Sequence, residues 1–244
     1  MISVKKKSTF VSALAVFAAF NVICDSFMVP FLPYSGVWHS WIFISAPITG
    51  ILLGPWFGFL SSLLGVIIGH SILFIGAEEL LFTLGAPIGA MISAFLYRRE
   101  WKIPLIYYLV LLVAFFCTPI VWQLPYWGIW GMWDIFLALG LFFVMIMAME
   151  KREKIWSMKS RFHLTFVLAL SVFIGLEADV LFRIFVFVPC QTYQLFYGYD
   201  VGSLQAIWAL GAIETPIKAA LSTIVNIIIG PSIIYVARKM GLAL

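Results

Sequence analysis

The feature that most constrains this sequence is a succession of long apolar runs, separated by short charged or turn-forming stretches. A run of about 20 apolar residues is long enough to cross the hydrocarbon core of a bilayer as a helix. The chain has 244 residues, of which only 11% are charged, against about 25% in an ordinary soluble domain. We therefore predict a single all-α, polytopic transmembrane helical bundle of about eight segments. The segments are residues 8–28, 40–53, 55–75, 80–97, 103–122, 130–149, 163–188 and 204–238.

The basic residues indicate how the chain is oriented. All Lys and Arg residues except Arg183 and Lys218 fall into four clusters between the apolar runs. The clusters are residues 5–7, 98–102, 151–161 and 238–239. The predicted loops of the opposite side carry only acids, which are Asp25, Glu78, Glu79, Asp134 and Asp200. Because cytoplasmic loops are enriched in Lys and Arg, we expect a multi-pass protein of the cell membrane with both termini cytoplasmic. No small-residue cleavage site follows the first apolar run, so we expect that run to remain as a span.

Two basic residues lie inside predicted spans, and each has an acid four residues before it. Asp179 precedes Arg183, and Glu214 precedes Lys218. Residues four apart share a helix face and can neutralise each other, whereas Glu177 lies on another face. An ionised group in hydrocarbon costs at least about 2.5–3.5 kcal/mol, so these side chains should face the interior of the bundle. We predict that the five residues form a polar pocket open to the outside. Ion pairs that only hold two helices in register are the alternative.

The last apolar stretch is too long for one membrane crossing. Residues 204–238 would make a helix of roughly 52 Å, against a hydrocarbon core of about 30 Å. Thr215 is a good N-cap and Pro216 suits a first helical position, so we predict a break there that leaves Glu214 in the outer half of the membrane. At Gly54-Pro55 two expectations stay open, a surface turn between helices or a break within the membrane.

The sequence carries no known catalytic or phosphate-binding motif. Patterns of the GxSxG, HExxH, CxxC and phosphate-loop types are absent. The three cysteines lack metal spacing, and no basic stripe suits nucleic acid. We therefore predict that the chain is not an enzyme, needs no cofactor or metal ion, and binds no nucleic acid. His70 is expected to be a satisfied core residue, and Asn21 and Asn226 are expected to bond between helices. Close helix packing is predicted at Gly54, Gly58, Gly65, Gly69, Gly85 and Gly89.

Several segments, taken in order, resemble one family of membrane proteins. The first span has an AxxxA pattern, and the second turns into the third through Gly-Pro. These matching segments are Ala15 with Ala19, Ile48–Gly58, Leu84–Gly89 before Tyr97–Arg99, and Pro216–Lys239 with Gly230-Pro231. In this order the chain resembles the S components of energy-coupling factor (ECF) transporters, the membrane subunits that capture vitamins or related micronutrients. The resemblance covers roughly two thirds of the chain.

The resemblance implies a function and a set of partners. It implies a six-helix core whose later spans bind a small water-soluble vitamin or related micronutrient from the outside, under a cap formed by the loop 25–39. The later spans hold the predicted pocket residues Glu177, Asp179, Arg183, Glu214 and Lys218. The small-residue face at Ala15 and Ala19 would pack against a transmembrane coupling subunit, and two cytoplasmic ATPases would supply the energy for uptake. The chain departs from the family at residues 103–149, which we interpret as an inserted helical hairpin.

Two other functions stay open from the sequence. The chain could be a self-sufficient secondary transporter or permease, which would move its substrate without partner ATPases. It could also be an intramembrane enzyme that uses Glu177, Asp179 or Glu214 as acid or base, and would then turn over a substrate in purified form.

Overall fold

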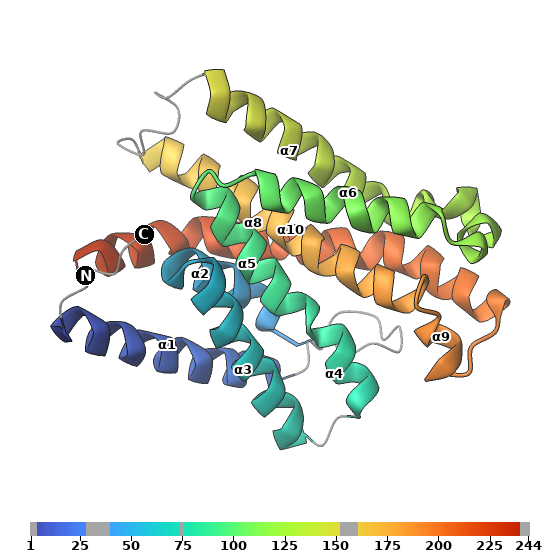
Figure 1. Ribbon diagram of the computed structural model, residues 1–244, viewed down its shortest axis with the longest axis horizontal. Coiled ribbons are helices and arrows are strands. Elements are labelled where there is room, and N and C mark those ends of the chain that lie inside the picture. Colours follow the sequence, from blue (N-terminus) through green and yellow to red (C-terminus); the bar gives the residue numbers. More distant parts are fainter. Residues whose placement is uncertain (1–3, 28–39, 74–75, 152–160, 240–244) are drawn as a thin grey trace.

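The computed structural model describes residues 4–27, 40–73, 76–151 and 161–239, and within these ranges the regular elements are all helices (Figure 1). The long elements in chain order are α1 (Val4–Asp25), α2 (Ile42–Leu53), α3 (Pro55–Leu73), α4 (Ala77–Thr83), α5 (Gly85–Tyr97), α6 (Lys102–Phe116), α7 (Trp133–Lys151), α8 (Arg161–Phe187) and α10 (Val201–Lys239). The short ones are the 3-10 helices η1 (Pro119–Gln123), η2 (Pro125–Gly128) and η3 (Trp130–Met132), and α9 (Thr192–Leu195). The all-α prediction is confirmed for the described residues.

Several of these helices are suited to a bilayer. In the described part of the chain, five are long and apolar enough to cross a membrane. They are Pro55–Ile72, Glu79–Tyr97, Trp130–Met149, His163–Phe187 and Val201–Lys239. Three further apolar helices, Val11–Asp25, Ile42–Leu53 and Lys102–Phe116, are shorter. The chain thus has the helices of a membrane protein, several of them long and apolar enough to span a bilayer, and the count of eight spans stays a prediction.

Two predicted segments differ in detail from the helices that form. Segment 80–97 is divided at Leu84 into α4 and α5. In segment 103–122 the α-helix stops at Phe116, and 3-10 turns that contain Pro119 and Pro125 follow. A proline lacks the amide hydrogen that would continue an α-helix, which accounts for the tighter turns.

Helices α5 and α8 pack closely at the centre of the bundle, through glycines. A side chain at Gly85 would overlap the carboxylate of Asp179, and one at Gly89 would lie 2.9 Å from the carbonyl oxygen of Gly175. Small residues at a helix interface let two backbones approach within a membrane. The close-packing prediction is therefore confirmed at Gly85 and Gly89. Helix α1 packs on α3 at one edge of the bundle, and α7 lies at the other edge (Figure 1).

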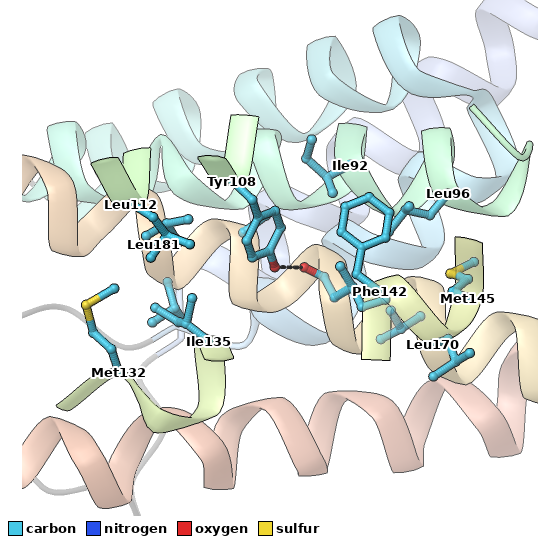
Figure 2. Close-up of a cluster of buried hydrophobic side chains, with 14 of the residues drawn as sticks. Ile92, Leu96, Tyr108, Leu112, Met132, Ile135, Phe142, Met145, Leu170 and Leu181 are labelled. Carbon is cyan, nitrogen blue, oxygen red and sulfur yellow. Dashed lines mark hydrogen bonds between the residues drawn. The ribbon is translucent and has the colours of Figure 1, made fainter. Parts of the chain in front are cut away.

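The predicted inserted hairpin corresponds to α6, the 3-10 turns and α7, which cover one side of α8. Figure 2 shows Tyr108 of α6 among buried apolar side chains of the neighbouring helices, with its hydroxyl bonded to a backbone oxygen. That hydroxyl donates to the Ile174 carbonyl at 2.6 Å, and the Tyr107 hydroxyl donates to the Ala178 carbonyl at 2.8 Å. The hairpin is therefore joined to α8 by hydrogen bonds as well as by apolar packing.

The Gly54-Pro55 step is a tight turn between two antiparallel helices. Gly54 has a φ of 87°, a conformation that favours glycine, and its amide bonds to the Gly50 carbonyl at 2.7 Å. The guanidinium of Arg98 lies beside Gly54. A charged group at this point favours the surface turn over the break within the membrane. In Figure 1 the start of α1 and the ends of α5, α7 and α10 lie toward one end of the molecule. Their cytoplasmic location stays a prediction.

The predicted break at Thr215-Pro216 does not occur, because α10 runs unbroken for 39 residues through Pro216 and Pro231. This prediction was wrong for an identifiable reason. Pro216 cannot bond to the carbonyl of Ala212, one turn earlier, but the indole nitrogen of Trp133 donates to that carbonyl at 2.8 Å. Freed carbonyls in membrane helices are tolerated when a neighbouring helix supplies a donor.

The two asparagines join helices as predicted. The amide oxygen of Asn21 accepts the Ser45 hydroxyl at 2.7 Å, which links α1 to α2. The side-chain nitrogen of Asn226 donates to the Ile44 carbonyl at 3.0 Å, which links α10 to α2.

Candidate functional site

A cavity of about 110 Å³ lies between α8 and α10, and α4 and η3 complete its wall. Its polar lining comes from Arg183, Glu214, Thr215 and Lys218. The remaining lining residues are apolar side chains and glycines, which are Phe82, Gly131, Val180, Ile184, Phe187, Ile207, Trp208 and Gly211. Three of the five residues predicted for the pocket therefore meet in one cavity.

The predicted pair of Asp179 and Arg183 forms on α8. The Nε of Arg183 donates to Oδ1 of Asp179 at 2.6 Å, and Nη2 donates to Oδ2 at 3.3 Å. The carboxylate is 2% exposed and the guanidinium side chain 13% exposed. Asp179 does not line the cavity. It lies against Gly85, where any larger side chain would displace it. The acid therefore fixes the guanidinium, and the guanidinium reaches the cavity.

Glu214 and Lys218 share a face of α10, as their spacing predicts, and both are buried. The ammonium group of Lys218 interacts electrostatically with the guanidinium of Arg183 and with the carboxyls of Asp179, Glu214 and Glu177. Its Nζ also lies 5.7 Å from the ring centroid of Phe43 on α2, within range of a cation–π contact. Lys218 is therefore a buried cation in a mixed cluster of charges from two helices, beside an aromatic face.

Glu177 is fully buried and is not a lining residue of the cavity. Within the described residues, neither of its carboxyl oxygens has a hydrogen-bond partner. Its carboxyl interacts electrostatically with Asp134, Asp179 and Lys218. It therefore belongs to the same charged cluster as the cavity residues, although it does not face the cavity itself.

Aromatic side chains form much of the apolar wall, and sequence reasoning had not selected them. Phe82 and Phe187 have ring centroids 5.7 Å apart, and both pack against Tyr197. The Tyr197 hydroxyl donates to Oε1 of Glu79 at 2.9 Å, which joins α4 to the segment between α9 and α10. On another part of the wall, Trp208 donates to the Gly128 carbonyl at 3.2 Å. Contacts between residues so far apart in the chain leave no local sequence signal.

A second polar network lies near the C-terminal ends of α1 and α3, and its Asp25 interacts electrostatically with Arg183 of the cavity. Asp25 accepts the Ser40 hydroxyl at 2.7 Å and lies 2.6 Å from Nδ1 of His70. Nε2 of His70 lies 2.9 Å from the Thr83 hydroxyl. The prediction that His70 is a satisfied core residue is confirmed. The prediction that Asp25 and Asp134 lie in outer loops is wrong, because both are fully buried and each is held by hydrogen bonds.

The remaining sequence predictions concern the small-residue face of α1, the capping loop, the cysteines and metal binding. Ala15 and Ala19 are exposed on one face of α1. Most of the predicted capping loop 25–39 falls outside the described residues. The three cysteines are free thiols. Within the described residues, no group of three or more His, Cys, Asp or Glu side chains is arranged to hold a metal ion.

No protein-family model, no characterised protein and no solved structure matches this chain. Its function must therefore be argued from the cavity. Two cations and an acid face a space with aromatic walls inside a bundle of membrane helices. Such a site can bind a small molecule that carries both signs of charge and an aromatic or otherwise flat ring.

Proposed function

We propose that this chain is the substrate-capture subunit of an ATP-driven importer of the ECF type, and that it binds a small water-soluble vitamin or a related micronutrient. The observation that carries the proposal is the cavity where Arg183, Glu214 and Lys218 converge beside aromatic side chains. Ionisable residues inside membrane spans usually mark a pathway or a binding site, since their burial is costly. The resemblance of the span order to S components supports the same function.

The lining supports a polar ligand with a carboxylate and an amine. Arg183, already oriented by its acid partner, and Lys218 would bind the carboxylate, and Glu214 would accept hydrogen bonds from the amine. The rings of Phe82 and Trp208 would contact the body of the ligand. Glu177 and Asp179 would act through the residues that they neighbour, since neither lines the cavity.

Ligand binding can be tested by a thermal-shift screen of the detergent-purified chain against water-soluble vitamins, nucleobases and their precursors. A compound at a hundred times its Kd stabilises by about 2.7 kcal/mol, which corresponds to roughly 5–10 °C for a chain of this size. The shift should disappear in Arg183→Ala and Glu214→Ala. It should persist in the control Lys102→Gln, which removes a positive charge at an exposed position. A shift that survives both cavity substitutions would contradict the proposed site.

Energy coupling requires a separate test. Ala15 and Ala19 lie on an exposed helix face, and a close contact of small residues there would let a coupling subunit approach. We expect Ala15→Leu with Ala19→Leu to abolish co-purification with a coupling subunit and two ATPases, while the melting temperature stays unchanged. Val16, 65% exposed and one position away, supplies the control Val16→Leu. Retention of the partners by the double leucine variant would refute this docking face.

The proposed orientation places both termini in the cytoplasm and the cavity toward the outside. The clustering of the basic residues supports it. The test introduces single cysteines into a cysteine-free variant of the protein and treats intact cells with a membrane-impermeant maleimide. The reagent should label Gln205→Cys in intact cells and Lys102→Cys only after permeabilisation. The reverse labelling pattern would show that the protein has the opposite orientation in the membrane.

A second candidate, a self-sufficient secondary transporter, is favoured by Glu177. A buried carboxyl within a span is the kind of group that carries protons in such proteins. Proteoliposomes that contain only this chain decide between the two functions. Uptake driven by a proton gradient and lost in Glu177→Gln would favour the secondary transporter. No uptake by the chain alone, with uptake gained when a coupling subunit and ATPases are added to the proteoliposomes, would favour the capture subunit.

A further inference from the structure

Pro216 interrupts the hydrogen bonding of α10 beside three residues of the cavity. A proline has no amide hydrogen, so the carbonyl four residues earlier, that of Ala212, receives no bond from within the helix. An unsatisfied carbonyl inside a membrane costs several kcal/mol and leaves the helix free to bend. Glu214, Thr215 and Lys218 lie within two residues of this proline. Any bend at Pro216 would therefore change the shape of the cavity.

Helix α7 supplies the hydrogen-bond donor that Pro216 lacks. The indole nitrogen of Trp133, the first residue of α7, donates to the Ala212 carbonyl at 2.8 Å. The next residue, Asp134, accepts the hydroxyl of Thr215, and its other oxygen accepts the Ile135 amide at 2.9 Å. Two consecutive residues of α7 thus bind α10, one at the freed carbonyl and the other at Thr215, three residues later.

The position of these two residues is fixed by their neighbours in sequence. Met132 and Ile135, which flank Trp133 and Asp134, are fully buried. Figure 2 shows them grouped with Leu181 of α8. Because buried apolar side chains set the register of a helix against its neighbours, they fix the positions of the indole and the carboxylate relative to α10.

The same arrangement recurs at a second proline. Pro47 lies inside α2 and frees the carbonyl of Phe43. The hydroxyl of Ser222 on α10 donates to that carbonyl at 2.7 Å. The ring of Phe43 in turn faces Lys218. In both cases a side chain from another helix replaces a missing amide, and in both cases the contact involves α10 next to the cavity.

We propose that Trp133 is a positioning residue for the cavity, because its indole replaces the amide that Pro216 lacks and so fixes the direction of residues 214–218. The consequence for ligand binding rests on the proposed function. The consequence for the α10 backbone does not, so the two can fail separately.

The test is a double-mutant cycle in the full-length chain in detergent. The variants are Trp133→Phe, Pro216→Ala and their combination, with Trp130→Phe as the matched control, since Trp130 and Trp133 are similarly exposed at 48% and 44%. Hydrogen–deuterium exchange of the amides in residues 209–218 reports the backbone. The panel of vitamins and nucleobases, read as thermal shifts, reports the cavity.

Loss of the indole bond should speed exchange in residues 209–218 about fivefold, which corresponds to about 1 kcal/mol. The control Trp130→Phe should change it less than twofold. The Pro216→Ala substitution restores a backbone amide hydrogen at this position, so Trp133→Phe should have no further effect in that background. The thermal shift given by a panel compound should fall in Trp133→Phe and return in the double variant.

Three results would overturn the proposal. Equal exchange in Trp133→Phe and Trp130→Phe would show that the indole does not hold α10. An increase that is as large in the Pro216→Ala background would show that Trp133 acts only by packing. If the backbone cycle behaves as expected and a panel compound binds wild type and Trp133→Phe equally, the positioning role is refuted. If no compound raises the melting temperature of the wild-type protein, the proposed function fails. The role of Trp133 is then decided by the hydrogen-exchange cycle alone.

Discussion

Removal of the carboxylate of Asp179 should destabilise the protein far more than removal of both members of its ion pair. In Asp179→Ala, the guanidinium of Arg183 would lose the two hydrogen bonds of 2.6 and 3.3 Å that hold it. Its side chain is only 13% exposed, so water cannot fully replace them. Breaking one side of a buried pair costs about 3–5 kcal/mol. At 2–4 °C per kcal/mol for a chain of this size, the melting temperature should fall by roughly 6–20 °C.

The combination of Asp179→Ala with Arg183→Met removes the uncompensated charge and leaves an apolar side chain of similar length. Replacement of a buried pair by apolar residues is often neutral or stabilising, so the double variant should melt within a few degrees of wild type. High salt should change neither result, because a buried pair is poorly screened.

The assay is thermal unfolding of the detergent-purified protein, followed by intrinsic tryptophan fluorescence. A single variant that melts like wild type would refute the reasoning, as would a double variant no more stable than Asp179→Ala. The double variant also separates the two roles that the sequence left open. If it is stable and gives no thermal shift with the panel, Arg183 contacts ligand. If it is stable and still gives the shift, the pair only holds the structure.

Three other outcomes follow from the same contacts. Gly85→Ala would place a methyl group against the buried carboxylate of Asp179. It should lower the free energy of unfolding by about 1–3 kcal/mol, measured in a melting assay. The control Gly140→Ala, at a position with open space around it, should not be destabilising. His70→Ala leaves a buried carboxylate one hydrogen bond short and should cost about 1–3 kcal/mol, a loss that the exposed neighbour Ser71→Ala should not reproduce. Burial raises the pKa of the Cys190 thiol from its usual 9.0. Since the thiolate is the reactive form, maleimide labelling of this thiol should keep accelerating above pH 9, and a plateau near neutral pH would contradict the raised pKa.

Local rules of the sequence accounted for the parts of the site that lie on one helix. The four-residue spacing of Asp179 and Arg183 fixes their shared face whatever surrounds them, and the pair forms as expected. The same rule placed Glu214 and Lys218 together. The cost of charge in hydrocarbon correctly directed these side chains inward. Neither rule could identify the aromatic wall, because Phe82 and Trp208 come from different helices, and no periodicity within one helix shows which side chains meet across the bundle.

The burial of Asp25 shows where the charge pattern misled. An acid next to a predicted outer loop was assigned to that loop, yet its carboxylate turns into the bundle toward His70. The cue was the glycine at position 69, since a side chain there would come within 2.7 Å of the Asp25 carboxylate. A glycine that makes room for a polar group looks the same in sequence as a glycine that makes room for a backbone.

The wrong prediction of a break in α10 has a more general consequence. Thr215-Pro216 carries every local signal of a helix start, and the helix continues only because a donor 79 residues away in the chain occupies the freed carbonyl. That donor belongs to the hairpin of residues 103–149, which the sequence analysis interpreted as an insertion into a six-helix core. The hairpin also satisfies α8 backbone carbonyls through Tyr107 and Tyr108. Because both helices that carry the charged residues depend on it for hydrogen bonds, the hairpin is a structural part of the cavity and could not be deleted without changing it.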